Sequence, residues 1–273
     1  MTIRRKRKYV LAAGVVVAAL LVILAVRRSG SGPGTSSPRT LTVAAAADLR
    51  FALEELVSRF EDLHPDIEVN VAYGSSGDFF AKLSSRAPFD VFLSADVIYP
   101  QRLAQEGLTL AGSEFRYAAG RIVIWVPRSS SLEVEKLGIK ALLDPSVRKI
   151  AIPNPHHAPY GKAAEAAMKS LGIYEAVKDR LVLGENVAQT VQFVQSGAAD
   201  VGIIARSLAL APSLQEGGRC GEIPLDAYPR IEQAGVILKW ARDPGAAWRL
   251  KEFVTGPRGQ EILRRYGFLP PGE

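Results

Sequence analysis

The chain has 273 residues, a length that suits one large domain or two ordinary ones, and its single cysteine, Cys220, excludes an intrachain disulfide. The formal net charge of +6 suggests a nucleic-acid partner, but eight of the 34 basic residues and none of the 28 acidic residues lie in residues 1–39. The remainder is therefore nearly neutral, with 26 basic against 28 acidic residues, which argues against nucleic-acid binding.

Residues 1–28 have the pattern of a membrane segment. Five basic residues precede the 17-residue apolar run from Val10 to Val26, which is at the lower length limit for crossing a bilayer, and Arg27 and Arg28 follow it. A cleaved signal peptide begins in the same way, but no small-x-small cleavage site falls between the run and the two arginines. We therefore expect an uncleaved signal-anchor that makes the protein single-pass, with its remaining domains extracytoplasmic, and we keep a cleaved, secreted form as the alternative.

Residues 29–39 read SGSGPGTSSPR, a Gly/Ser/Pro-rich composition without apolar periodicity. Such a composition predicts a disordered linker, with an r.m.s. reach of roughly 18 Å for 11 residues.

Three strand–helix units follow over residues 40–107. Buried strands are predicted at 41–47, 67–73 and 90–96, each followed by a helical pattern, and Asp48 is placed to cap the first helix. The crossover rule then gives a parallel sheet, and ligands bind at the carboxyl ends of such strands. Those ends hold Ala47 and Asp48, then Gly74–Gly77, then Ser94 and Ala95, which we expect to meet at one rim.

The turn Gly74-Ser75-Ser76-Gly77 stands between the second strand and its helix. A strand, a turn with hydroxyl groups and a helix start together present N–H groups and a helix N-terminus to an anion. The simpler interpretation is that a serine only caps the helix.

A second α/β pattern occupies the middle of the chain, with strands at 149–152, 181–183 and 201–205 and helices at 161–171 and 187–195. Two similar extended segments, 117–126 and 231–240, flank it, and helices at 245–254 and 257–265 close the chain. This arrangement predicts two parallel-sheet lobes joined by two crossover segments, with a ligand in the cleft between them. The lobes would be 40–120 plus 231–273, and 121–230; one continuous sheet of seven or more strands is the alternative.

Six segments spread over residues 41–269 carry a family resemblance: LTVAAAADL, AYGSSGDFFAKL, APFDVFLSAD, NPHHAPYG, GENVAQTVQFVQSGAADVGII and RYGF. In sequence and in order they resemble segments of the periplasmic molybdate-binding proteins of ABC importers. The resemblance implies a type II periplasmic-binding-protein fold and an extracytoplasmic protein that captures molybdate, or tungstate, for a permease and ATPase. It implies a monomer that is not an enzyme and has no cofactor. An extracellular sensor domain is the alternative.

Carried over to this sequence, the ligand-binding positions of the family are Asp48, Ser76, Ala95, Tyr160 and Val187. Ala95 and Val187 would act through their main-chain N–H groups, and the molybdenum would be held only through its oxygens, by Asp48, Ser76, Tyr160 and Val187. Apart from Asp48, these groups are neutral donors, which suit a dianion whose oxygens only accept hydrogen bonds.

Asp48 departs from the family, which usually has a hydroxyl or amide residue there. A carboxylate repels a dianion, so three interpretations stay open. The side chain turns away and caps its own helix, or the site takes a protonated or differently charged ligand, or the preference has moved to another oxyanion such as sulfate or phosphate.

The other chemistries are weaker. His156 and His157 are adjacent, and His64 is distant in sequence, so a zinc site is not expected. GSSG is not the nucleophile-elbow pattern, which has a glycine two residues on either side of the serine, so a hydrolase is not expected either.

Overall fold

The computed structural model describes residues 39–272, which fall within one compact unit. The predicted anchor (1–28) and all of the predicted linker except Arg39 lie outside the described residues. Within residues 39–272, no helix combines the length and the apolar character needed to cross a membrane.

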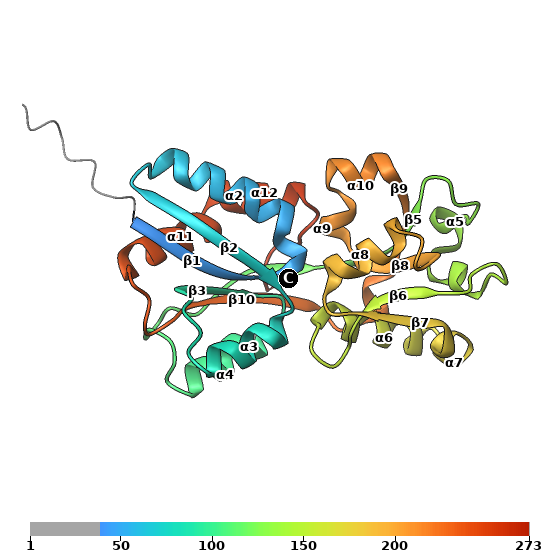
Figure 1. The fold of residues 1–273 in the computed structure, drawn as a ribbon, viewed down its shortest axis with the longest axis horizontal. Helices are drawn as coiled ribbons and strands as arrows, with labels where there is room; N and C mark the ends of the chain where they lie inside the picture. The colour runs from blue at the N-terminus through green and yellow to red at the C-terminus, as the bar shows by residue number, and fades with distance from the viewer. Residues whose placement is uncertain (1–38, 273) are drawn as a thin grey trace, which may run out of the picture. The chain divides into compact units, whose positions relative to one another are not determined.

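Two separate five-stranded sheets form the centre of two lobes, which excludes one continuous sheet (Figure 1). The first sheet has the order β2-β1-β3-β10-β4, with strands β1 (Arg39–Ala46), β2 (Ile67–Gly74), β3 (Val91–Ser94), β4 (Phe115–Gly120) and β10 (Ile231–Ile237). The second has the order β7-β6-β8-β5-β9, with strands β5 (Ile122–Pro127), β6 (Ile150–Pro153), β7 (Leu181–Gly184), β8 (Val201–Ala205) and β9 (Gly218–Glu222).

Both sheets are mixed, so the prediction of parallel sheets is wrong. In the first lobe β1 pairs in parallel with β2 and β3, but β10 runs antiparallel to both β3 and β4. In the second lobe β6 is parallel to β7 and β8, whereas β5 is antiparallel to β8 and β9. The antiparallel strands are those that carry the chain from one lobe to the other. Strands β5 and β10, which take part in every antiparallel pair, follow β4 and β9 of the other sheet with no α-helix between, so the crossover rule does not govern them.

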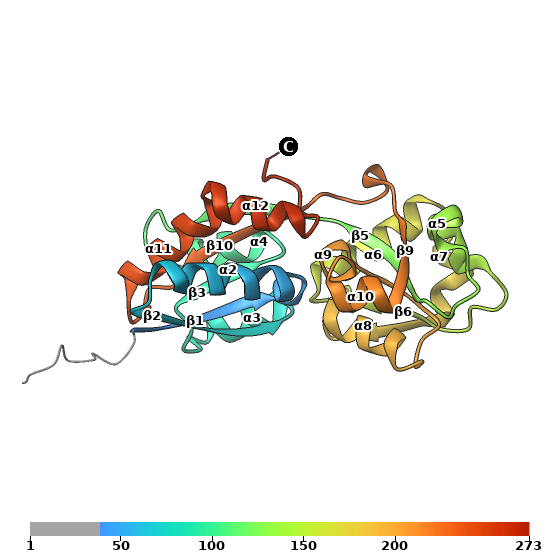
Figure 2. The same ribbon diagram turned by 90° about the horizontal axis from the view of Figure 1, so that it is seen from above.

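The predicted long strand 117–126 is two strands in different sheets. β4 ends at Gly120 and β5 begins at Ile122, so the chain passes from the first lobe to the second at Arg121. The chain returns between β9 and β10. Figure 2 shows both connections running between the lobes.

Helices cover both faces of the first sheet. In Figure 1, α2 (Arg50–Leu63), α11 (Pro244–Thr255) and α12 (Pro257–Arg265) lie on one face, and α3 (Ser76–Ser84) and α4 (Ile98–Gln105) lie on the other. Each face has its own buried cluster. One includes Leu53 of α2 and Leu250 of α11, and the other includes Phe79 of α3 and Leu103 of α4.

The second sheet is covered in the same way by α8 (Val187–Gln195), α9 (Arg206–Ala209) and α10 (Pro212–Gly217) on one face and by α6 (Pro159–Ser170) and α7 (Tyr174–Val177) on the other (Figure 1). Several short elements were not predicted; they are α5 (Val134–Leu137) and the 3-10 helices η1 (Ala47–Leu49), η2 (Gly138–Leu143), η3 (Lys178–Arg180) and η4 (Leu225–Ala227), together with α7, α9, α10 and β9. These elements are three to six residues long, too short for helical or strand periodicity to show in the sequence.

Asp243 joins the start of α11 to the start of β1, and its contribution to the stability of the protein should depend on pH. Its carboxylate caps α11 by accepting from Ala246 N at 3.0 Å, and it also accepts from Arg39 Nη2 at 2.8 Å. The hydrogen bond from Arg39 lowers the pKa of Asp243 to about 2. Its stabilising effect is therefore complete above the unfolded pKa and is lost as the pH falls from about 4 through about 2.

We expect Asp243→Ala to lower the free energy of unfolding by about 1–2 kcal/mol at pH 7, mainly through the lost cap. The difference from wild type should shrink as the pH falls from about 4 to about 2. Urea unfolding at pH 7, 4 and 2.5 measures it, and a difference that does not change with pH would rule out the ionised pair as its source.

Candidate functional site

All five predicted binding residues line one cavity between the lobes. It has a volume of about 10 Å³, and its lining residues are Ala46, Ala47, Asp48, Gly74, Ser75, Ser76, Ala95, Ala158, Pro159, Tyr160, Asn186 and Val187. The strand ends after β1, β2 and β3 supply the first-lobe side of the cavity, as expected for the carboxyl ends of parallel strands. The second-lobe side comes from the starts of α6 and α8.

Three helices begin at this cavity. They are α3, α6 and α8, of nine, twelve and nine residues, and their first residues Ser76, Pro159 and Val187 all line it. The first-turn N–H groups of a helix have no acceptor within the helix, and the helix dipole places partial positive charge there. None of the described residues that line the cavity is Lys, Arg or His. The positive potential therefore comes from dipoles, a suitable environment for an anion.

The two serines of the turn have different partners. Ser75 is the N-cap of α3, and its Oγ accepts from Asp78 N at 3.2 Å. Ser76 is buried, and its Oγ accepts from Ala95 N at 2.9 Å, so two predicted binding groups are bonded to each other. The capping interpretation thus applies to Ser75, while Ser76 keeps its hydroxyl proton for another acceptor.

Val187 is the first residue of α8, and the residue before it, Asn186, caps the helix. Asn186 accepts through its side chain from Ala188 N and Gln189 N, at 3.0 and 3.1 Å. The cap leaves out Val187 N–H, so this N–H group stays at the cavity as a donor.

Asp48 does not cap a helix, which corrects the capping expectation. It lies within η1, and α2 begins later, at Arg50, with no side-chain cap. Its Oδ2 instead accepts from Tyr160 Oη at 2.8 Å and from Gln233 Nε2 at 2.6 Å, and the side chain is buried. The distant residues Tyr160 and Gln233 supply donors for the carboxylate, so the local capping position is not used.

Burial governs the ionisation of Asp48. Desolvation raises the pKa of this carboxyl to about 6, while the hydrogen bonds from Gln233 and Tyr160 act in the opposite direction and limit the rise. The pKa of Tyr160 is also raised well above its usual value, by burial first and then by the charge of Asp48. Tyr160 therefore stays protonated, and its hydroxyl donates a hydrogen bond to Asp48.

Gln233 is a site residue that sequence reasoning missed. It lies in β10, is fully buried, and also donates from Nε2 to Tyr160 Oη at 3.1 Å. Gly120 is close to the same group, and a Cβ there would lie 2.1 Å from Tyr160 Oη. A glutamine within the buried strand sequence IEQAGVI was the available signal, because a buried amide needs partners.

His157 is the second residue that sequence reasoning missed, and it joins the lobes. Its main-chain O accepts from Gly77 N at 3.0 Å, and its Nδ1 lies 3.0 Å from Ser75 Oγ and 3.6 Å from Asp78 Oδ1. Ser207, from α9 of the second lobe, adds another contact by donating to Asp48 O at 2.7 Å. The cavity is therefore enclosed by hydrogen bonds from one lobe to the other.

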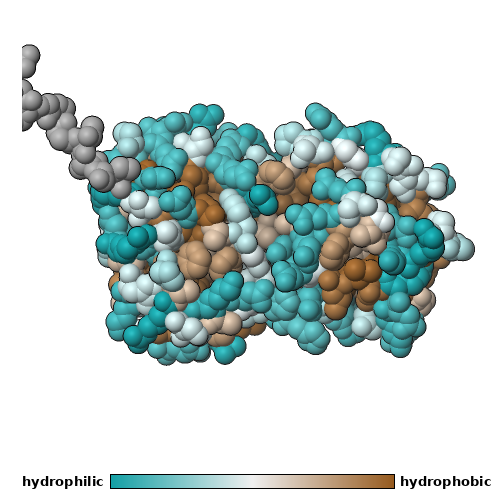
Figure 3. All heavy atoms as spheres, in the orientation of Figure 1, coloured by the Kyte–Doolittle hydropathy of each residue, from teal (hydrophilic) through white to brown (hydrophobic). Residues whose placement is uncertain are grey.

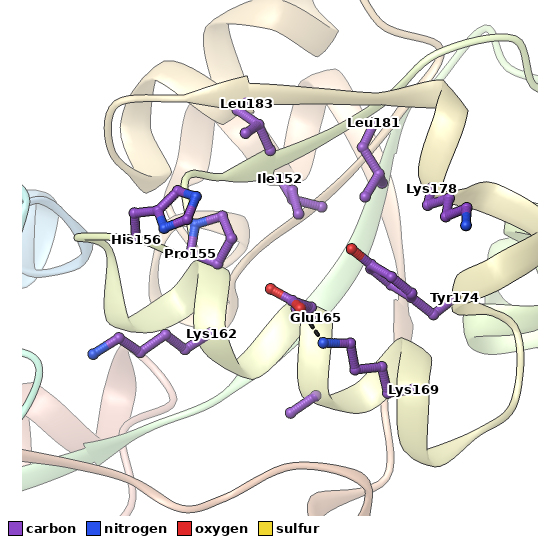
Figure 4. Close-up of a pocket in the computed structure, with 11 residues that line it drawn as sticks. Ile152, Pro155, His156, Lys162, Glu165, Lys169, Tyr174, Lys178, Leu181 and Leu183 are labelled. Atoms are coloured by element: carbon purple, nitrogen blue, oxygen red, sulfur yellow. Dashed lines mark hydrogen bonds and ion pairs between the residues drawn. The ribbon is translucent and has the colours of Figure 1, made fainter.

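A second cavity, of about 590 Å³, lies in the second lobe and contains none of the predicted residues (Figure 4). Its floor includes Leu181 and Leu183 of β7, and apolar surface gathers over β7 in Figure 3. Its Lys169 is paired with Glu165, and its Lys178 with Glu175. Its cations already have carboxylate partners, so it suits a small oxyanion less well. Among the described residues, no three His, Cys, Asp or Glu side chains are grouped to hold a metal ion.

Comparison with known proteins gives four consistent similarities. Residues 41–269 match the family described as "Bacterial extracellular solute-binding protein". The molybdate-binding protein ModA of Azotobacter vinelandii is 35% identical over 226 residues, which is 83% of this chain and 88% of that protein. ModA of Rhodobacter capsulatus is 37% identical over 201 residues, 74% of this chain and 77% of that protein. The solved A. vinelandii periplasmic molybdate-binding protein superposes with a TM-score of 0.79 at 31% identity, covering 85% and 99% of the two chains.

Proposed function

Because the chain belongs to the bacterial extracellular solute-binding protein family, we propose that it captures molybdate, or tungstate, between its lobes and delivers it to an ABC permease and ATPase. The names of the two ModA relatives support molybdate as the ligand. The binding groups would be Ser76 and Asp48 through their side chains, Tyr160 through the hydrogen bond that its hydroxyl donates to Asp48, and Ala95 and Val187 through main-chain N–H; all five residues line one cavity.

The convergence of three helix N-termini on a cavity without cationic side chains is the observation that carries this proposal. Oxygens of molybdate and tungstate accept hydrogen bonds, and each bond to a charged group contributes about 1.5–3 kcal/mol. The cavity of about 10 Å³ is close to the size of one water molecule. A larger anion therefore requires Ser76 Oγ and Ala95 N to separate and turn toward it.

The same proposal assigns the lobes as 40–120 plus 231–273 and 121–230, so that each lobe contributes one side of the cavity. The protein would be a monomer without a cofactor and without catalytic activity, since the relatives it resembles are named as binding proteins. Residues 1–28 would hold it at the membrane as a signal-anchor. Mass spectrometry of the mature N-terminus tests the anchor, and a start near residue 30 or later would contradict it.

Ser76→Ala tests the site directly. Losing one hydrogen bond to a charged ligand should weaken molybdate binding about 10- to 100-fold. Ser84→Ala, at the exposed far end of the same helix, is the matched control and should bind as the wild type does. Calorimetric titration of the purified full chain with molybdate, tungstate, sulfate and phosphate measures both variants. Absence of binding to molybdate and tungstate would end the proposal.

Asp48 is the reason to include oxyanions other than molybdate and tungstate in that titration. An ionised carboxylate about 4 Å from a dianion repels it by about 8 kcal/mol at an effective dielectric constant of about 20. A ligand that carries its own proton, such as hydrogen phosphate, would avoid much of this repulsion by donating to the carboxylate. Tighter binding of phosphate than of molybdate would therefore favour this second ligand class.

A further inference from the structure

The two oxygens of the Asp48 carboxyl have unequal surroundings. Oδ2 accepts two hydrogen bonds, from Tyr160 Oη and Gln233 Nε2. Oδ1 is buried and has no hydrogen-bond partner within the described residues, and Asp48 lines the cavity. A buried polar atom without a partner is costly in a protein, so the missing interaction is one that a ligand can supply.

The surroundings of the two oxygens determine which of them would carry a proton. Oδ2 already accepts from Tyr160 and Gln233, so a proton on Oδ2 would displace one of these donors. Oδ1 has room for a proton, and a protonated carboxyl becomes a donor. The single phenolic proton of Tyr160 is used in the hydrogen bond to Oδ2. Within this cluster, a protonated Oδ1 would therefore be a donor still available to an anion.

Among residues 39–272, no cation compensates the charge of Asp48. The titratable groups that face it are Tyr160 from α6 and Tyr117 from β4, and the pKa of each is raised by burial and by the charge of Asp48. Gln233 of β10 and Ser207 of α9 are neutral, and α8 has no titratable side chain. Arg206, next to Ser207, is paired with Glu222. An ionised Asp48 would therefore oppose a bound dianion with its full charge.

We propose that the oxyanion binds together with one proton, which resides on Asp48 Oδ1 and is donated to an oxygen of the bound anion. This inference rests on the function proposed above and adds proton coupling to it. The reaction is the uptake of one dianion and one proton by the ionised protein. Asp48 thereby changes from a repelling charge to a donor, the role that a hydroxyl or amide residue would have at the same position.

The direction of the pH dependence follows from burial. The pKa of Asp48 is raised to about 6, so the carboxyl is mainly ionised at pH 7 and above and must take up the proton when the anion binds. Bound dianion raises this pKa further, because a neighbouring negative charge disfavours the ionised form. Affinity should thus be highest below about pH 6 and fall about tenfold for each pH unit above it.

Calorimetry of the wild-type full chain with molybdate tests the coupling without any substitution. Titrations at pH 6, 7 and 8, each in two buffers of different ionisation enthalpy, give the affinity and the number of protons taken up. We expect about 50-fold weaker binding at pH 8 than at pH 6, because about half of the carboxyl is protonated at pH 6 and about 1% at pH 8, and an uptake close to one proton per anion at pH 8. Binding without proton uptake and without pH dependence would overturn the coupling and leave the proposed function standing.

Asp48→Asn supplies the matched comparison, because the amide keeps the shape of the carboxyl and has a permanent donor. It should bind molybdate with less than about threefold change from pH 6 to pH 8, and about tenfold or more tighter than wild type at pH 8. Asp226→Asn, at an exposed carboxyl of η4, should retain the full pH dependence of the wild type. Equal pH dependence in Asp48→Asn and wild type would overturn the assignment to Asp48. Absence of molybdate and tungstate binding in every variant at every pH would overturn the proposed function as well.

Discussion

Replacing Gly77 with alanine is expected to weaken molybdate binding about 10- to 100-fold without destabilising the folded protein. A Cβ at position 77 would lie 2.6 Å from His157 O, 2.9 Å from its Cβ and 3.0 Å from its Cα. Two of these three atoms belong to the main chain of the opposite lobe, so no side-chain rotation relieves the contact. The lobes would then be held apart where the Gly77 N–H now donates to His157 O at 3.0 Å.

The stability of the same variant separates this effect from misfolding. Gly77 lies in the first turn of α3 and has no positive φ, so alanine fits the helix and is the better helix former. The thermal midpoint should therefore stay the same or rise while affinity falls. Gly217→Ala is the control, because nothing lies within 4 Å of its added Cβ. Unchanged affinity in Gly77→Ala would mean that binding does not need the lobes to approach this closely.

Asp90→Ala should be among the most destabilising single substitutions in the first lobe, lowering the free energy of unfolding by about 3–5 kcal/mol. The Asp90 side chain is 2% exposed and joins three segments. Its Oδ2 accepts from Thr42 N at 2.6 Å and from Thr42 Oγ1 at 2.7 Å, and its Oδ1 accepts from Arg242 N at 2.8 Å. Alanine would leave two main-chain N–H groups without partners at the junction of β1, β3 and the segment after β10.

Urea unfolding monitored by circular dichroism measures this loss. Asp90→Asn should fall between alanine and wild type, because its amide oxygen can accept at only one of the two sites. Asp62→Ala is the control, since the side chain of Asp62 is 67% exposed and its removal should change stability by about 0.5 kcal/mol or less. A loss below about 1 kcal/mol for Asp90→Ala would show that packing and main-chain hydrogen bonds hold the three segments without the side chain.

The parts of the fold that could be predicted from sequence are those with local signals. Helix α8 and strand β8 have the predicted bounds, 187–195 and 201–205, because apolar periodicity and flanking caps mark them. The convergence of Asp48, Ser76 and Ala95 followed from the rule that parallel strands end at one edge, and the three do line one cavity. The family resemblance added Tyr160 and Val187, which line the same cavity from the other lobe.

The parts that could not be predicted depend on distant partners. β10 lies between β3 and β4 and runs antiparallel to both. The apolar pattern of a strand does not indicate in which direction the strand runs in its sheet. Asp48 has the local signal of a helix cap, but Tyr160 and Gln233, 112 and 185 residues away, donate to its carboxylate instead. His157 was discounted as a metal ligand, and its contact with Ser75 and Gly77 appears only once the two lobes are placed together.

The central claim is that an oxyanion binds in the cavity lined by Asp48, Ser76, Ala95, Tyr160 and Val187. Anomalous diffraction from a crystal grown with tungstate tests it most directly, because tungsten scatters strongly and marks its own position. We predict one dominant anomalous peak in this cavity, with oxygens of the anion within hydrogen-bond distance of Ser76 Oγ, Ala95 N and Val187 N. A dominant peak elsewhere, for example beside Lys162 and Lys169 in the second-lobe cavity of Figure 4, would contradict it.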